Sequence, residues 1–243
     1  MRYAVLGDIH ANLHALEAVI EDARSFSCSE FHLLGDVVGY GAFPAECVSI
    51  ARDLPGSCVL GNHDEAASGG KSLEGFSEVA RISLKWTRDS LSTDQKTWLG
   101  ALRLQRQIRR TTFVHATLYS PLGWGYVREV ADAEMSLALQ RTPLCFIGHT
   151  HVPRAFAQGT GEMLLFEPPD QGVRLPREPK YLVNAGSVGQ PRDGDPRAAY
   201  MIHDEERDGL WLRRVDYDIE AAAAAILAAG LPEKLAARLR TGS

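Results

Sequence analysis

Cys145-Phe146-Ile147-Gly148-His149-Thr150-His151 is the stretch of sequence from which the fold can be inferred. Its apolar residues predict a buried β-strand that ends at the glycine, and two histidines follow at alternate positions. Because side chains two residues apart share one side of an extended backbone, both imidazoles can face the same point. Open α/β sheets carry their sites beyond the carboxyl ends of strands, so we expect His149 and His151 at such a site. A His-x-His pair alone is more often structural or solvated.

The same order of residues recurs along the chain: an apolar run predicts a strand, and a polar loop follows it. Strands are predicted over residues 2–6, 31–34, 57–60, 108–114, 145–147 and 181–183. Each loop alone is most simply a turn, but their repetition favours one shared site. The polar candidates that follow the first five strands are Asp8, His10, Asp36, Asn62, His63, Asp64, His115, His149 and His151.

Helices are predicted between these strands, which indicates the α/β class. They cover residues 13–23, 42–52 and 131–140, and two more are expected over 221–229 and 233–240. Asn12 is a predicted N-cap, Ser92 with Gln95 forms a capping-box pattern, and residues 198–203 and 210–215 are predicted to form a hairpin. We expect a single domain over residues 1–243, with a helical excursion at about 65–103 that packs over one edge of the site.

Composition and charge limit the classes of function. The 243 residues are 45% hydrophobic and 23% charged, which is ordinary for a globular chain that buries a sizeable core. A net charge of -5 without a basic block argues against non-specific nucleic-acid binding. Four scattered cysteines without a C-x-x-C pair predict reduced thiols in a cytoplasmic protein. We expect neither a signal peptide nor a membrane-spanning segment.

The mixture of carboxylates, an amide and imidazoles predicts a metal centre. Such a set suits manganese, iron, cobalt, nickel or zinc. There are too many candidates for one tetrahedral zinc ion, and cysteine, which is common at structural zinc sites, is absent from the set. The candidates suffice for two divalent transition-metal ions that share one carboxylate and lie about 3.5–4 Å apart.

The order and spacing of these motifs resemble the calcineurin-like metallophosphoesterase superfamily, from the first strand to beyond the middle of the chain. Residues 184–192 also resemble small bacterial and archaeal members of phosphodiesterase type. Ala116 and Ala185 depart from the glycine and proline of many relatives, which bears on loop geometry and substrate fit. The motifs are Asp8-Ile9-His10, Gly35-Asp36, Gly61-Asn62-His63-Asp64, Val114-His115 and Gly148-His149-Thr150-His151.

The resemblance implies two packed central mixed β-sheets flanked by helices. It also implies that Asp8, His10 and His151 hold one metal, with Mn²⁺ favoured, that Asn62, His115 and His149 hold the second, and that Asp36 bridges them. His63, oriented by Asp64, would stabilise charge or protonate the leaving oxygen. Two cations lower the pKa of a bridging water, so a hydroxide is expected to attack phosphorus in line.

Phosphodiesters are the first choice of substrate. Phosphomonoesters (phosphoprotein included) and dinucleoside polyphosphates are the alternatives, and a non-catalytic interaction scaffold is a less favoured one. The candidate substrate contacts are Tyr40, Arg128 and Arg192, although each arginine is more simply solvated. The partner expected is a small phosphate ester. The sequence leaves open the natural substrate, the resident metals, the oligomeric state, and any substrate contact by the excursion or by residues 117–126.

Overall fold

Strand β1 (Arg2–Leu6) shows how the sequence forms two layers. Ala4 and Leu6 join one core cluster together with helix α1 (Leu13–Ser25), whereas Tyr3 and Val5 join a second cluster between the sheets. Alternation of this kind with apolar residues on both faces is typical of a strand covered on both sides. The structure is a computed structural model that describes residues 1–69, 72–161 and 163–243.

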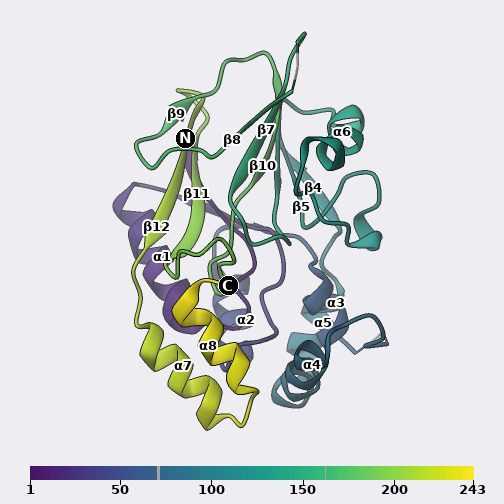
Figure 1. The fold of residues 1–243 in the computed structure, drawn as a ribbon, viewed down its shortest axis with the longest axis vertical. Coiled ribbons are helices and arrows are strands. Elements are labelled where there is room, and N and C mark those ends of the chain that lie inside the picture. Colours follow the sequence, from purple (N-terminus) through teal and green to yellow (C-terminus); the bar gives the residue numbers. More distant parts are fainter. Residues whose placement is uncertain (70–71, 162) are drawn as a thin grey trace.

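Within these residues two six-stranded sheets pack face to face, which confirms the predicted pair of central mixed sheets (Figure 1). In the first sheet β1, β2 and β3 run parallel, and in the second β5, β6 and β10 do so. The first has the order β3 (Gly56–Cys58), β2 (Glu30–Leu33), β1, β11 (Ala198–Asp204), β12 (Gly209–Val215), β9 (Val173–Arg174). The second has the order β4 (Gln105–Ile108), β5 (Thr111–Val114), β6 (Leu144–Ile147), β10 (Lys180–Asn184), β7 (Arg154–Gln158), β8 (Leu164–Phe166).

Helices cover the outer faces of both sheets and gather at one end of the molecule. Helix α1 packs on the first sheet and α6 on the second, and Figure 1 shows the α3–α5 and α7–α8 groups together at its lower end. The helices are α1 (Leu13–Ser25), α2 (Pro44–Asp53), α3 (Asn62–Ala67), α4 (Glu78–Ser90), α5 (Thr93–Gly100), α6 (Val130–Leu139), α7 (Ile219–Ala228) and α8 (Glu233–Thr241), with a 3-10 turn at Pro121–Gly123.

The predicted helix starts are confirmed by their capping bonds. The side chain of Asn12 accepts from the N–H of Ala15 at the start of α1. Ser92 and Gln95 exchange side-chain to backbone bonds of 3.1 and 3.2 Å at the start of α5. These bonds satisfy backbone donors that have no partner within the helix.

The strand predicted over residues 108–114 is instead part of a hairpin. Strand β4 ends at Ile108, Arg109 adopts a positive φ of 51°, and β5 begins at Thr111. Residues Gln105 to Gln107 are exposed and polar, because β4 is an edge strand, so no apolar run marked it. The helical excursion includes residues 70 and 71, which lie outside the described residues.

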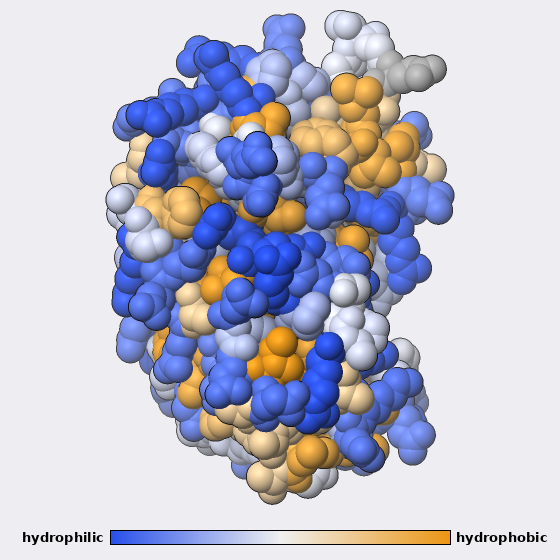
Figure 2. Space-filling view, turned by 60° about the vertical axis from the view of Figure 1, so that its left-hand side comes forward, coloured by the Kyte–Doolittle hydropathy of each residue, from blue (hydrophilic) through white to orange (hydrophobic). Residues whose placement is uncertain are grey.

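The surface view shows polar and charged residues predominating on the face drawn, with apolar residues in small separate groups (Figure 2). Small groups of this kind are ordinary on proteins in water. Among the described helices none is both long enough and apolar enough to cross a bilayer.

Candidate metal centre

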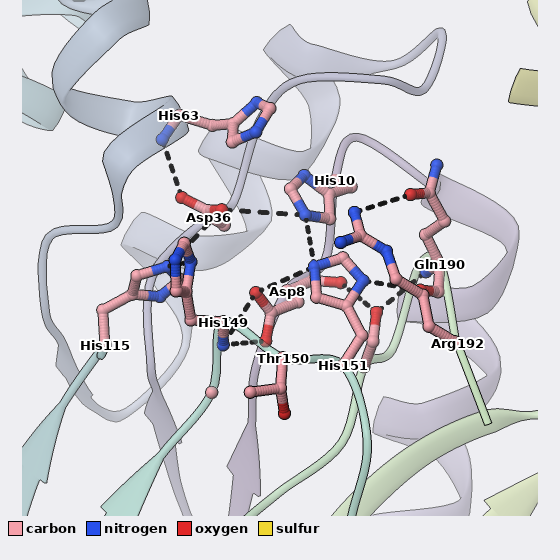
Figure 3. Close-up of polar contacts among 12 residues, drawn as sticks. Asp8, His10, Asp36, His63, His115, His149, Thr150, His151, Gln190 and Arg192 are labelled. Carbon is pink, nitrogen blue, oxygen red and sulfur yellow. Dashed lines mark hydrogen bonds and ion pairs between the residues drawn. The ribbon is translucent and has the colours of Figure 1, made fainter. Parts of the chain in front are cut away.

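The seven predicted metal ligands lie together beyond the carboxyl ends of parallel strands from both sheets, and Figure 3 labels all of them except Asn62. The loops after β1, β2 and β3 contribute from the first sheet, and those after β5 and β6 from the second. Six of the seven side chains are buried, and Asn62 is partly exposed. The ligand candidates are therefore Asp8, His10, Asp36, Asn62, His115, His149 and His151.

The backbone at these loops is strained. Asp8, His10, Asp36, His149 and His151 all have positive φ values, from 48° to 70°. The left-handed region costs a residue other than glycine roughly 1–3 kcal/mol, and it persists only where the surroundings fix it. Such residues concentrate at functional sites, so their gathering here supports a site that needs these side chains in set directions.

Two glycines allow the loops to approach the site closely. A Cβ atom on Gly39, whose φ is +88°, would lie 2.3 Å from Nδ1 of His63. A Cβ atom on Gly61 would lie 2.1 Å from Oδ1 of Asp36. Any larger residue at either position would displace a predicted functional side chain.

One ring nitrogen of each of the four ligand histidines faces a backbone carbonyl oxygen. A carbonyl can only accept, so that nitrogen carries the hydrogen and, in a neutral imidazole, the other nitrogen presents a lone pair. The contacts are His10 Nδ1 to Val38 O at 3.1 Å, His115 Nδ1 to Leu34 O at 2.8 Å, His149 Nε2 to Trp124 O at 2.9 Å and His151 Nδ1 to Gln190 O at 2.6 Å.

The remaining nitrogens meet in pairs. His10 Nε2 lies 3.1 Å from His151 Nε2, and His115 Nε2 lies 3.1 Å from His149 Nδ1. Burial lowers the pKa of all four histidines, in the case of His149 to about 3, so the imidazoles are neutral. Two facing lone pairs cannot form a hydrogen bond, and a cation between them would turn the repulsion into coordination. The donor set therefore fits metal ions.

The oxygen donors complete two adjacent groups. Oδ1 of Asp8 lies 3.3 Å from His151 Nε2, and Oδ1 of Asn62 lies 3.1 Å from His115 Nε2. Oδ2 of Asp36 stands between the groups, 3.7 Å from His10 Nε2 and 3.5 Å from His115 Nε2. Burial and the charges of Asp64 and Asp8 raise the pKa of Asp36, which nearby cations would counteract.

The prediction that Asp64 orients His63 is wrong. The Asp64 carboxylate accepts the backbone N–H groups of Asp36 and Val37 at 2.7 and 2.9 Å, and those of Val38 and Gly61 at 3.3 and 3.1 Å. Asp64 thus holds the loop after β2 to the start of α3. Asp64 directly follows His63 in the sequence, and nothing in the sequence indicates that its carboxylate accepts hydrogen bonds from backbone N–H groups.

His63 instead is held by its backbone and by ring packing. Its N–H donates to Oδ1 of Asp36 at 2.8 Å. Its ring packs edge-on against His10 and Phe76 and lies 4.5 Å from the ring of Tyr40. The Nδ1 atom is buried with no hydrogen-bond partner among the described residues, and His63 lines the pocket over the centre.

A pocket of about 560 Å³ opens over the centre. Of the predicted substrate contacts, Tyr40 and Arg192 line it. Arg128 does not: it is exposed, and its guanidinium lies 4.5 Å from the ring of Tyr126, which in turn stacks on His149 at 4.3 Å.

Some site features were absent from the sequence prediction. The carbonyls that hold the imidazoles have no sequence signal, because every residue carries a carbonyl. Phe76, Trp124 and Arg238 also line the pocket. The two aromatic residues lie in segments predicted to flank the site, whereas nothing local to Arg238 distinguishes it from the other basic residues of its helix.

Comparisons with known proteins agree with this geometry. A family model described as the calcineurin-like phosphoesterase superfamily domain matches residues 1–208. An uncharacterized protein of Methanocaldococcus jannaschii is 38% identical over 244 residues, which span 98% of this chain and 97% of that protein.

Two solved structures show the same architecture. A metallophosphoesterase from Sphaerobacter thermophilus is 39% identical, with a TM-score of 0.89 and coverage of 100% of this chain and 99% of that one. A hypothetical protein from Pyrococcus horikoshii has a TM-score of 0.81 at 17% identity, covering 100% of this chain and 98% of that one, and this likeness concerns the fold alone.

Proposed function

The chain belongs to the calcineurin-like phosphoesterase superfamily, and we propose that within it this protein is a dinuclear metal-dependent phosphodiesterase. Family membership identifies a metallophosphoesterase, which is a hydrolase. The number of metal ions and the preference for diesters are the parts that we propose.

The observation that carries the proposal is the pairing of unprotonated imidazole nitrogens across the centre. Asp8, His10 and His151 would hold one divalent ion, and Asn62, His115 and His149 the other. Asp36 lies between both groups and would bridge them. When bound, two such ions supply Lewis acidity and lower the pKa of a water molecule towards neutrality. Mn²⁺ is our first choice, and iron, cobalt, nickel and zinc suit the same donors.

His63 is the proposed general acid. It lines the pocket, and the contact of its backbone N–H with Asp36 fixes it beside the centre. A histidine placed there can protonate the oxygen of a leaving alkoxide. General acid catalysis of this kind typically contributes about 10²–10⁴-fold to the rate.

The walls of the pocket favour diesters over monoesters. A diester carries two organic groups, whereas a monoester carries one. The pocket is lined by the rings of Phe76, Trp124 and Tyr126 as well as Tyr40, and its volume of about 560 Å³ has room for both substituents. Arg192 lines the pocket, and Figure 3 shows it beside His151.

The test is hydrolysis of bis(p-nitrophenyl) phosphate by purified protein with Mn²⁺, after chelation, and as Asp36→Asn. We expect Mn²⁺-dependent hydrolysis that chelation abolishes and that the substitution lowers by roughly 10²-fold or more, because several kcal/mol of charge stabilisation are lost. Asp89→Asn, which changes an exposed carboxylate on α4, is the matched control and should leave the rate unchanged.

Activity that survives both chelation and Asp36→Asn would contradict the metal mechanism. Faster hydrolysis of p-nitrophenyl phosphate than of the diester would overturn the diester preference and leave the family assignment intact.

A further inference from the structure

Two guanidinium groups line the pocket, and they come from distant parts of the chain. Arg192 lies in the segment after β10, and Arg238 lies in α8, close to the carboxyl end of the sequence. Arg238 therefore lies outside the part of the chain that the family model covers, which is residues 1–208.

Neither guanidinium is neutralised by a carboxylate of the described residues. Arg192 donates to Oε1 of Gln190 at 3.0 Å and lies 5.9 Å from the centre of the Tyr40 ring, and its Nε is buried without a partner. The side chain of Arg238 makes neither an ion pair nor a hydrogen bond within the described part of the chain, although it is only partly exposed. By contrast, Arg240 on the same helix pairs with Glu220 at 2.7 Å.

The helix that carries Arg238 is held firmly in place. Leu235 and Leu239 are buried in a cluster with α7, and Tyr40 packs against the same cluster. The carbonyl of Gly242 accepts the N–H of Gly194 at 2.9 Å, which ties the end of α8 to the segment that contains Arg192. Both cations are thus presented to the pocket from connected segments.

The charge in the pocket exceeds what a simple diester needs. A phosphodiester group has one negative charge, and the metal centre with Arg192 already faces it. Glu74 is the one acidic lining residue apart from the ligand Asp36 within the described residues. Phosphate groups are common partners of arginine, because the guanidinium fork matches their oxygens.

We propose that Arg238 binds a second phosphate group of the substrate beside the scissile diester. This inference rests on the proposed phosphodiesterase function and names its substrate class: phosphodiesters that carry an additional phosphate, such as nucleotides phosphorylated at a second position. Tyr40 packs against the α7–α8 cluster, and its ring lies 5.9 Å from the Arg192 guanidinium, so it would border both phosphate groups.

A pair of chromogenic substrates tests the proposal, because both release the same leaving group. One is the p-nitrophenyl ester of thymidine 5′-phosphate, and the other carries an additional 3′-phosphate. We expect the wild-type kcat/KM for the doubly phosphorylated ester to exceed that for the simple ester by about tenfold or more. A hydrogen bond to a charged group contributes enough binding free energy for such a ratio. The isomer with exchanged ester and phosphate positions shows which side of the diester faces Arg238.

The variants separate binding from structure. Arg238→Gln should remove the advantage of the second phosphate, so that kcat/KM falls about tenfold further for the doubly phosphorylated ester than for the simple ester. Arg238→Lys should retain part of the advantage. Arg240→Gln is the matched control on the same helix and should change neither value. Melting curves of the three variants check that each is folded.

A binding measurement makes the test independent of turnover. Calorimetry should show that Arg238→Gln weakens binding of thymidine 3′,5′-bisphosphate about tenfold without weakening that of thymidine 5′-phosphate. Equal effects on both ligands, or no effect on either, would overturn the inference. If no ester is hydrolysed but the calorimetric difference holds, the proposed catalytic function fails and the second phosphate site stands.

Discussion

Four buried imidazoles share one arrangement in this protein: a main-chain carbonyl occupies one nitrogen, and the other faces the centre. The tautomer of each ring is therefore set by the protein before any cation arrives. Binding then needs little reorganisation of the rings, which favours affinity because the entropy of ordering has already been lost on folding.

His63 gives a test at the scale of one residue. His63→Gln should lower the hydrolysis of a dinucleoside phosphate by about 10²–10⁴-fold, because its alkoxide leaving group needs a proton. The same variant should affect bis(p-nitrophenyl) phosphate much less, since p-nitrophenolate is a stable anion. Steady-state rates on both substrates provide the measurement. Equal losses on both would remove His63 from the role of general acid.

His203 lies between the sheets, far along the sequence from the ligands. Its buried imidazole makes the free energy of unfolding depend on pH. Burial lowers its pKa from 6.5 to about 4, so the folded state resists a proton that the unfolded state accepts below about pH 6.5. The free energy of unfolding should therefore decrease as pH falls from 7 towards 4. Between pH 7 and 5 this one histidine should account for about 2 kcal/mol.

Urea denaturation of His203→Gln at pH 7 and pH 5 tests this contribution. The variant should lose less unfolding free energy across the interval than the wild type does, whatever its stability at pH 7. An unchanged difference between the two pH values would show that His203 does not titrate as described.

Individual ligands were the most predictable part of the site. His149 and His151 followed an apolar run, and the same pattern marked Asp8 and Asp36. The role of Asp64 was missed, because a carboxylate that accepts four backbone N–H groups looks in sequence like any acid beside a histidine. Arg238 was missed since only the tertiary fold brings α8 to the pocket.

At the scale of elements, the α7–α8 pair forms its own small core at the edge of the pocket. Alanines and leucines supply it, and Leu235 is completely buried. Apolar periodicity made both helices predictable from sequence, but their docking against Tyr40 was not, because it depends on packing between segments nearly 200 positions apart. Strand β4 is a different case, because its exposed polar residues carry no strand pattern. It is a strand because it pairs with β5.

Leu235→Ala tests how far α8 depends on this core. Removing a fully buried leucine side chain should lower the free energy of unfolding by about 2–4 kcal/mol. Hydrogen exchange should accelerate in α7 and α8 and remain slow in β6, because the cavity lies in the local cluster. Leu227→Ala, at a position 46% exposed, is the control and should cost about 0.5 kcal/mol or less. Equal acceleration in β6 would contradict a local core.

For the molecule as a whole, the ligand candidates join the two sheets. Asp8, His10, Asp36 and Asn62 follow strands of the first sheet, and His115, His149 and His151 follow strands of the second. The alternation of predicted strands and helices along the sequence was sufficient to predict an α/β arrangement. Division into two sheets came from the family resemblance, because strand order depends on long-range pairing that local patterns do not encode.

Metal ions should therefore stabilise the entire fold. At a free Mn²⁺ concentration about 100-fold above Kd, the free energy of unfolding should rise by about 2.7 kcal/mol. For a chain of this length, such a change raises Tm by roughly 5–10 °C. Calorimetric scans with and without Mn²⁺ measure the shift, which Asp36→Asn should reduce.

Elemental analysis of the purified protein complements the scans. We expect about two ions per chain under metal-replete conditions. Fewer than about one ion per chain, together with an unchanged Tm, would favour an interaction scaffold over an enzyme.

The acceptors that hold the four imidazoles belong to residues 34, 38, 124 and 190, and they are carbonyl groups. Point mutations replace side chains and leave carbonyls in place, so these positions can drift over evolution while the rings keep their direction, provided that the loops follow the same path. Descendants of such a protein can acquire new pocket walls, and with them new specificities, on an inherited reactive centre.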